Sequence, residues 1–207
     1  MPSWDYSGNG IYFLTIVTQN RVCSLGKIIE HIETHGRASI KLSDFGKIIE
    51  TELLKSFEIR DELFLDEYII MPNHLHVIVV LDKSEIENNN NLIGSHGLHV
   101  ETHGRASLPQ STKQSTDQSP KTTFIRKPKS ISSFFAGFKS SVNSKIDDYI
   151  DIQQLDIPKY NKNNHFFQPN YHDHIIRNNN EYNRIKNYII ENPQNWGDDK
   201  LNSGKTQ

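Results

Sequence analysis

The 207-residue sequence has little of what a secreted or membrane protein needs. Its single cysteine, Cys23, excludes an internal disulfide and fits a reducing compartment. The N-terminus lacks the basic start and apolar core of a signal peptide. No apolar run approaches the roughly 18 residues that cross a bilayer. We therefore expect a cytoplasmic, nucleoid-associated protein with no membrane partner.

An excess of positive charge is also missing. Lys and Arg number 23 against 25 Asp and Glu, so the formal net charge is −2 and the chain as a whole lacks the basic footprint of a nucleic-acid binder. Apolar residues make up 35% of the chain. Compact domains usually carry roughly 45–50%, on a count that includes glycine. Part of the chain therefore lies outside the core.

The composition places these non-core segments. We expect a single domain at residues 8–196, followed by a disordered tail at 197–207. Residues 83–130 are rich in Asn, Ser, Thr, Gln, Lys and Pro, which predicts a long flexible insertion. A smaller insertion is expected near residues 28–41.

The end of the long insertion is locally basic. Arg126, Lys127 and Lys129 fall in a stretch without acidic residues, and Lys139 follows it. Such a run fits either a solvated tether or contacts to DNA phosphates. These four residues and Arg177 are the candidate DNA-binding residues.

One heptapeptide, Glu-Thr-His-Gly-Arg-Ala-Ser, occurs at residues 33–39 and again at 101–107. Two distant copies do not make a solenoid, which needs tandem units. We interpret them as translated copies of a short mobile DNA repeat. Their histidines, His35 and His103, are therefore poor ligand candidates.

The densest chemical signal is the stretch at residues 71–80, Met-Pro-Asn-His-Leu-His-Val-Ile-Val-Val. A bend at Pro72 leads into a β-branched run that favours a strand. Alternate side chains of a strand share a face, so His74 and His76 point the same way and can reach one divalent cation. An isolated His-X-His pair also occurs by accident on a half-exposed sheet. Here, however, the pair interrupts an apolar run, where a polar group needs a partner.

Periodicity predicts the other elements. The sequence predicts strands at 11–18, 63–71 and 74–81 and after the turn at 169–170, and helices at 43–58, 131–146 and 180–192, with a polar loop at 147–164.

The last predicted helix carries a candidate nucleophile. Tyr188 and Asn192 are four residues apart and share one helix face, beside the apolar stripe of Ile185 and Ile189. A tyrosine hydroxyl, with an ordinary pKa of about 10, attacks a phosphate when a cation polarises the phosphate. Packing of the stripe near the histidine strand would bring Tyr188 to the metal. The alternative is a tyrosine that only packs.

Several blocks then resemble one family in the same order along the chain. Residues 68–78, Tyr-Ile-Ile-Met-Pro-Asn-His-Leu-His-Val-Ile, resemble the His-hydrophobe-His signature of the HUH single-strand endonucleases. Together with residues 167–177 and the Tyr-Ile-Ile-Glu-Asn-Pro block at 188–193, they resemble the single-tyrosine, REP-associated tyrosine transposases.

The resemblance implies an α+β, ferredoxin-like antiparallel sheet with helices on one face and a C-terminal helix carrying the catalytic tyrosine. It implies that His74, His76 and Asn192 hold Mg²⁺ or Mn²⁺, and that Tyr188 cleaves single-stranded hairpin DNA through a 5′-phosphotyrosine link before strand transfer. Relatives include both monomers and homodimers, so both states stay open.

Alternatives remain at this stage. Tyr171 and Tyr182 compete as nucleophiles, and His172 and His174 form a second His-X-His pair. A histidine-triad hydrolase would need a third histidine at Ile78. A hairpin-binding protein that has lost the chemistry is the non-enzymatic alternative.

Overall fold

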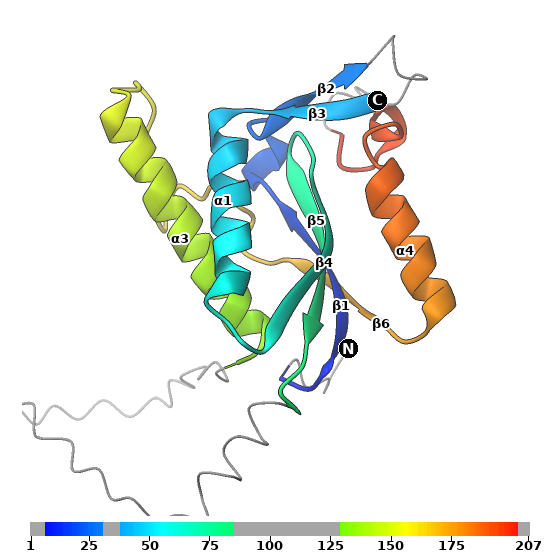
Figure 1. Cartoon of the computed structure of the whole chain (residues 1–207). Coiled ribbons are helices and arrows are strands. Elements are labelled where there is room, and N and C mark those ends of the chain that lie inside the picture. The colour runs from blue at the N-terminus through cyan, green and yellow to red at the C-terminus, as the bar shows by residue number, and fades with distance from the viewer. Residues whose placement is uncertain (1–6, 31–37, 85–128, 203–207) are drawn as a thin grey trace, which may run out of the picture.

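The computed structural model describes residues 7–30, 38–84 and 129–202. Its centre is a four-stranded antiparallel sheet with the strand order β4-β5-β1-β6 (Figure 1). The strands are β1 (Gly10–Val17), β4 (Leu63–Ile70), β5 (His74–Leu81) and β6 (His172–Ile176). The long helices are α1 (Asp44–Glu58), α3 (Ile131–Ile152) and α4 (Asn179–Glu191).

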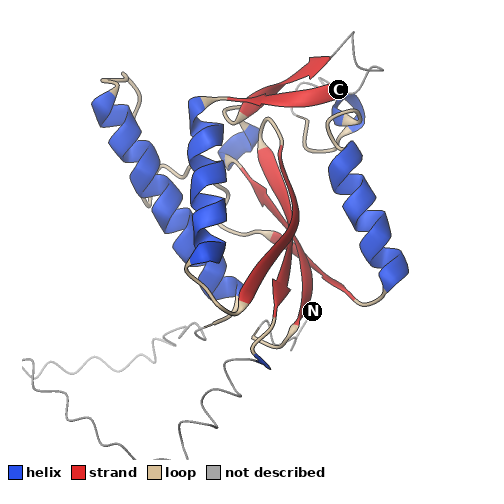
Figure 2. Ribbon diagram, in the orientation of Figure 1, coloured by secondary structure: helices blue, strands red, loops and turns tan. Residues whose placement is uncertain are grey.

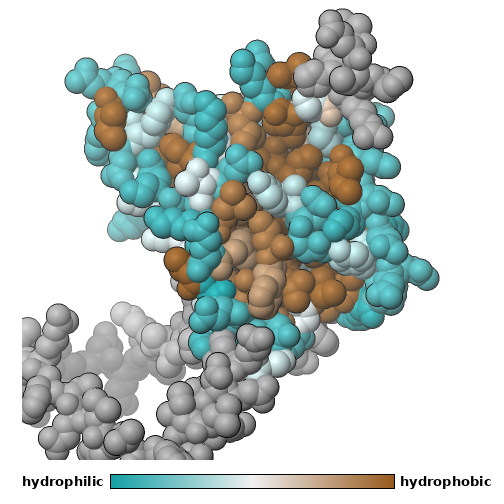
Figure 3. Space-filling view, viewed as in Figure 1, coloured by the Kyte–Doolittle hydropathy of each residue, from teal (hydrophilic) through white to brown (hydrophobic). Residues whose placement is uncertain are grey.

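The order of elements, strand-helix-strand-strand-helix-strand, confirms the expected ferredoxin-like α+β fold. Helices α1 and α3 cover one face of the sheet, and α4 packs on the other face (Figure 2). Figure 3 shows hydrophilic residues along the outer sides of α3 and α4 and hydrophobic residues gathered between the helices. In the described part of the chain, no helix combines the length and apolarity that a membrane crossing requires.

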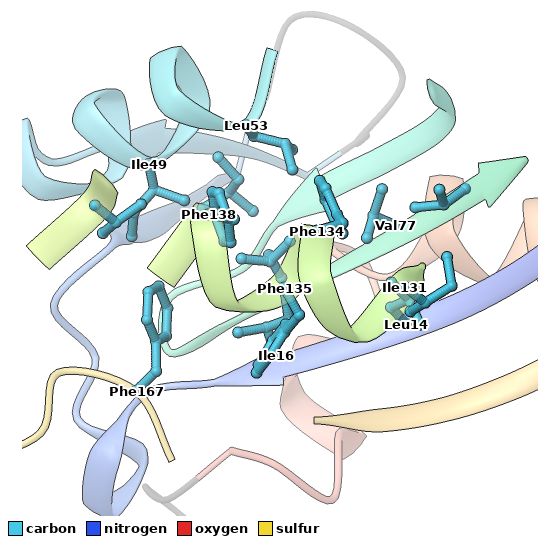
Figure 4. Close-up of a cluster of buried hydrophobic side chains, with 14 of the residues drawn as sticks. Leu14, Ile16, Ile49, Leu53, Val77, Ile131, Phe134, Phe135, Phe138 and Phe167 are labelled. Atoms are coloured by element: carbon cyan, nitrogen blue, oxygen red, sulfur yellow. The ribbon is translucent and has the colours of Figure 1, made fainter. Parts of the chain in front are cut away.

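Strand β5 divides its side chains between the two faces. Leu75 and Val77 join the large core beneath α1 and α3, where Figure 4 shows Val77. Ile78 instead packs with Ile185 and Ile189 of α4. Because alternate residues of a strand share a face, the histidines of β5 lie on the α4 side of the sheet with Ile78.

The helices begin where the sequence predicts. The Ser43 hydroxyl accepts from the backbone N–H of Gly46 and caps α1, and Ser130 and Ser133 form a reciprocal capping box at the start of α3. The end predicted for the second helix was wrong. Residues 147–152 continue α3 instead of starting a loop, because Ile150 extends the buried stripe by one more turn.

An ion cluster ties α4 to the sheet edge. A register irregularity between Leu65 and Tyr68 interrupts the pairing of β4 with β5. There the Asp66 carboxylate accepts from Lys186 Nζ at 2.9 Å, and Tyr182 OH lies 3.2 Å from the same ammonium group. These charged hydrogen bonds raise the pKa of Lys186. The helix is therefore held by polar contacts as well as by its isoleucine stripe.

Two segments expected to lie outside the core contain regular structure. Within the segment near residues 28–41, β2 (Gly26–Glu30) and β3 (Ala38–Leu42) form an antiparallel ribbon. A 3-10 helix, Trp196–Asp198, extends into the predicted disordered tail, and the carbonyls of Lys200 and Leu201 accept hydrogen bonds from Arg21 and Asn73. The predicted long insertion falls almost wholly outside the described residues, as do Arg126, Lys127 and the second heptapeptide copy.

Candidate metal centre and nucleophile

The two histidines of β5 meet on the α4 face of the sheet. His74 is fully buried and His76 is 3% exposed. Their Nε2 atoms lie 3.1 Å apart. Two imidazole nitrogens this close suit a shared cation, since each offers a lone pair when the ring is neutral.

The outer nitrogens of both rings have partners that set this orientation. Asn73 Nδ2 donates to the carbonyls of Arg21 and Leu201, so its Oδ1 faces His74 and lies 2.8 Å from Nδ1. Because Oδ1 only accepts, Nδ1 of His74 carries the proton and Nε2 presents its lone pair. Thr15 Oγ1 lies 2.8 Å from Nδ1 of His76. Such outer contacts are typical of metal-ligating histidines.

Burial keeps both rings neutral. It lowers the pKa of His74 to about 4, against a smaller opposing effect of the Asp199 carboxylate. Burial, and next the neighbouring His74, lower the pKa of His76 well below its ordinary value. Metal ligation requires neutral imidazole, so these rings are ready to ligate at neutral pH.

A carboxylate that the sequence analysis missed completes the cluster. Asp199 Oδ2 lies 3.8 Å from His74 Nε2, and its side chain is only 7% exposed. The ligand atoms of His74, His76 and Asp199 all lie within 4.8 Å of one another. Arg21 donates to the carbonyl of Lys200, and this contact holds the segment in place together with the bond from Asn73 to Leu201. The only signal in the sequence was an acid shortly after the tyrosine helix.

Helix α4 brings Tyr188 to the same place. Its hydroxyl lies 3.2 Å from His76 Nε2, and its ring meets Phe13 edge-on, with centroids 6.2 Å apart. Burial, and next the charge of Asp199, raise the pKa of Tyr188, while hydrogen bonding with the Asn192 side chain works in the opposite direction. The hydroxyl is therefore protonated at neutral pH in the metal-free protein.

Asn192, one turn later, is 1% exposed. Its Oδ1 is buried and has no hydrogen-bond partner among the described residues. A buried amide oxygen without a partner is costly, and a bound cation or ligand group would satisfy it. Asn192 thus stays a predicted ligand, now beside Asp199.

A cavity of about 770 Å³ opens beside this cluster, between β6, α4 and the C-terminal segment. Tyr188 is 43% exposed into it, so a substrate can reach the hydroxyl. Its charged lining residues carry both signs, Arg184 and Lys200 against Asp198 and Asp199, and His172 and His174 of β6 also line it. His174 is paired with Glu181 at 2.7 Å, which favours a structural role for this second histidine pair.

The competing tyrosines are engaged elsewhere. Tyr182 OH interacts with Lys186, and Tyr171 packs on Phe135 with ring centroids 4.2 Å apart. Phe135 belongs to the core beneath α1 and α3, on the face away from the histidines. Only Tyr188 touches the histidine cluster among the described tyrosines.

The candidate DNA-binding residues are scattered. Lys139 Nζ donates to the carbonyls of Gln168 and Pro169 and lies over the Phe135 ring, where burial lowers its pKa to about 8. Arg177 is exposed between β6 and α4, and Lys129 is exposed just before α3. Their contacts with DNA stay predictions.

No protein-family model matches the chain. An uncharacterized protein of Haemophilus influenzae is 28% identical over 206 residues, a match that covers 97% of this chain and 89% of that protein. A solved REP-associated tyrosine transposase bound to a REP hairpin is similar with a TM-score of 0.48 and 16% identity, covering 95% of this chain and 74% of that one. Similarity at this level assigns neither family nor activity.

Proposed function

We propose that this protein is a metal-dependent single-stranded DNA endonuclease and strand transferase that acts on hairpin repeat DNA through Tyr188. One observation carries the proposal. The Tyr188 hydroxyl, the Nε2 atoms of the histidine pair and the Asp199 carboxylate converge at the wall of an open cavity. The transposase-like blocks at residues 68–78 and 188–193 support DNA as the substrate.

The residues fit a divalent cation. His74 and His76 direct neutral nitrogens at one point, Asp199 supplies a carboxylate beside it, and the Asn192 oxygen lacks a partner. Two histidines and an oxygen ligand suit first-row divalent metals such as Mn²⁺, and Mg²⁺ is the alternative. When bound, the cation would polarise the scissile phosphate and favour the ionised form of a nearby hydroxyl.

The protein's own groups then account for the steps. Tyr188 Oη attacks the phosphorus and gives up its proton to solvent in the open cavity, while the bond to the 3′ oxygen breaks and that oxygen takes up a proton from solvent. The products are a 5′-phosphotyrosine and a free 3′-OH. Attack by another 3′-OH on the phosphotyrosine reverses the sequence and joins the strands. The covalent link keeps the phosphodiester energy, so no external energy source is needed.

The test uses purified full-length protein and labelled single-stranded oligonucleotides that carry the palindromic repeats flanking its gene, with Mn²⁺ or Mg²⁺. A denaturing gel should show a metal-dependent covalent adduct, and mass spectrometry should map it to Tyr188. The Tyr188→Phe variant should bind the hairpin without forming the adduct, and Tyr182→Phe is the matched control that should still cleave.

Other outcomes are equally informative. Cleavage that survives in Tyr188→Phe would move the nucleophile to another residue. A shifted hairpin without any adduct in either metal would leave a DNA-binding protein that lacks the chemistry.

A further inference from the structure

The β2–β3 ribbon places two positive charges opposite each other. Lys27 and Lys41 are direct cross-strand partners, and both side chains are exposed. Like charges at directly opposed positions destabilise a β-ribbon. In the described part of the chain, neither ammonium group has a carboxylate or other hydrogen-bonding partner. Among the described residues, nothing therefore offsets the repulsion between the two lysines.

A second cavity lies at this lysine pair. It has a volume of about 770 Å³ and is formed by the ribbon and the turn that follows α4. Lys27 and Lys41 line one side, and Gln194 and Trp196 line the other. None of the described residues that line it is acidic, so this lining is positive in a chain whose net charge is −2. We call this cavity the lysine groove.

The lysine groove adjoins the metal centre. The Trp196 ring lies beside His74, with centroids 6.0 Å apart, and also lines the groove. Residues of the same turn alternate between the two cavities: Asn192 and Asn195 line the Tyr188 cavity, whereas Gln194 lines the groove. The picture agrees, because the ribbon passes next to the C-terminal end of α4 (Figure 1).

We propose that the lysine groove is a second anion-binding site, which holds backbone phosphates of the DNA strand whose scissile phosphate lies at Tyr188. The inference rests on the proposed function, because it assigns the groove to the same strand. Phosphates would relieve the repulsion between Lys27 and Lys41, and the Trp196 edge and Gln194 would meet the sugar and base. The sequence motifs gave no hint of the lysine pair, since Lys41 lies in the insertion expected near residues 28–41 and Lys27 lies just before it.

The test measures how the binding of single-stranded DNA by a non-cleaving variant depends on salt concentration. Each phosphate neutralised on single-stranded DNA contributes about −0.7 to the slope of log K against log salt. Lys27→Gln/Lys41→Gln in a Tyr188→Phe background should therefore flatten the slope by about 1.4 for a long oligonucleotide. Lys27→Arg/Lys41→Arg should keep the slope.

The control removes the same charge elsewhere. Lys55 and Lys162 are exposed and line neither cavity. The variant Lys55→Gln/Lys162→Gln has the same net charge as the groove variant and should leave the slope unchanged. The melting temperature of the groove variant should equal or exceed that of the parent, because the like-charge pair is gone.

The outcomes separate the two proposals. If the parent binds DNA but the groove and control variants have the same slope, the lysine groove inference fails and the proposed function stands. If the parent binds no single-stranded DNA, the proposed function fails, and the groove assignment fails with it.

Discussion

The metal-free protein should lose stability as the pH falls from about 6.5 to about 4. Unfolded histidines have a pKa of about 6.5. In the folded protein, burial lowers the pKa of His74 to about 4 and that of His76 well below its ordinary value. Between these values the unfolded state binds protons that the folded state does not, so the free energy of unfolding rises with pH and falls on acidification.

The expected effect is large. A difference of about 2.5 pKa units at His74, at about 1.36 kcal/mol per unit, corresponds to about 3 kcal/mol. His76 adds to it with the same sign. Small domains are stable by only about 5–15 kcal/mol, so a substantial part of the margin is at risk. Carboxylates with lowered pKa, such as Glu181, lose their contribution only at still lower pH, because unfolded carboxyl groups titrate near about 4.

Urea denaturation followed by circular dichroism, in EDTA at pH 7.0, 6.0, 5.0 and 4.5, measures the effect. His74→Gln should show a clearly shallower decline than the parent, because one of the two buried rings is gone. His172→Gln, at an exposed histidine, should decline like the parent. A parent profile that is flat between pH 6.5 and 4.5, or a His74→Gln profile as steep as the parent, would refute the reasoning.

Three further predictions concern the Asp199 carboxylate, the Lys186–Asp66 contact and the aromatic core. Asp199→Asn should weaken Mn²⁺ binding, measured by calorimetry, by about tenfold or more, because it replaces an anionic ligand; an unchanged affinity would exclude Asp199 as a ligand. Lys186→Met should lower the free energy of unfolding and speed hydrogen exchange in α4, with Lys186→Arg as the conservative control; unchanged exchange would contradict a role of the Lys186–Asp66 contact in holding α4. Phe138→Ala should cost about 3–5 kcal/mol in urea denaturation, because the ring is fully buried against Phe134 and Phe167; a cost below about 1 kcal/mol would contradict this packing.

Local sequence patterns were enough to predict the strands of the sheet and to predict which side chains share a face within each strand or helix. The two-residue period put His74 and His76 on one face of β5, and the four-residue spacing put Tyr188 of α4 and its C-cap residue Asn192 on one side of the helix. Capping residues marked the helix starts within a residue or two. These relations depend only on backbone geometry, which is why periodicity reveals them.

Composition was a weaker guide. The segment near residues 28–41 lacks a clear period, and its strands form because they pair with each other and not because of their residue types alone. Asp199 gave little signal in the sequence beyond its place shortly after the tyrosine helix. A single carboxylate seven residues beyond Asn192 has no periodic relation to the histidines, and its place depends on long-range bonds from Asn73 and Arg21.

The sequence alone therefore settles which side chains share a face, because the backbone repeats of strands and helices impose those relations wherever the element lies. Only the tertiary structure decides which faces meet. The strand order β4-β5-β1-β6, the Lys186–Asp66 contact and the isoleucine stripe bring α4 over the histidine face. The folded C-terminal segment then adds Asp199. The positions of α4 and of Asp199 both depend on contacts between residues far apart in the chain. The free energy of such contacts cannot be read from a local sequence pattern.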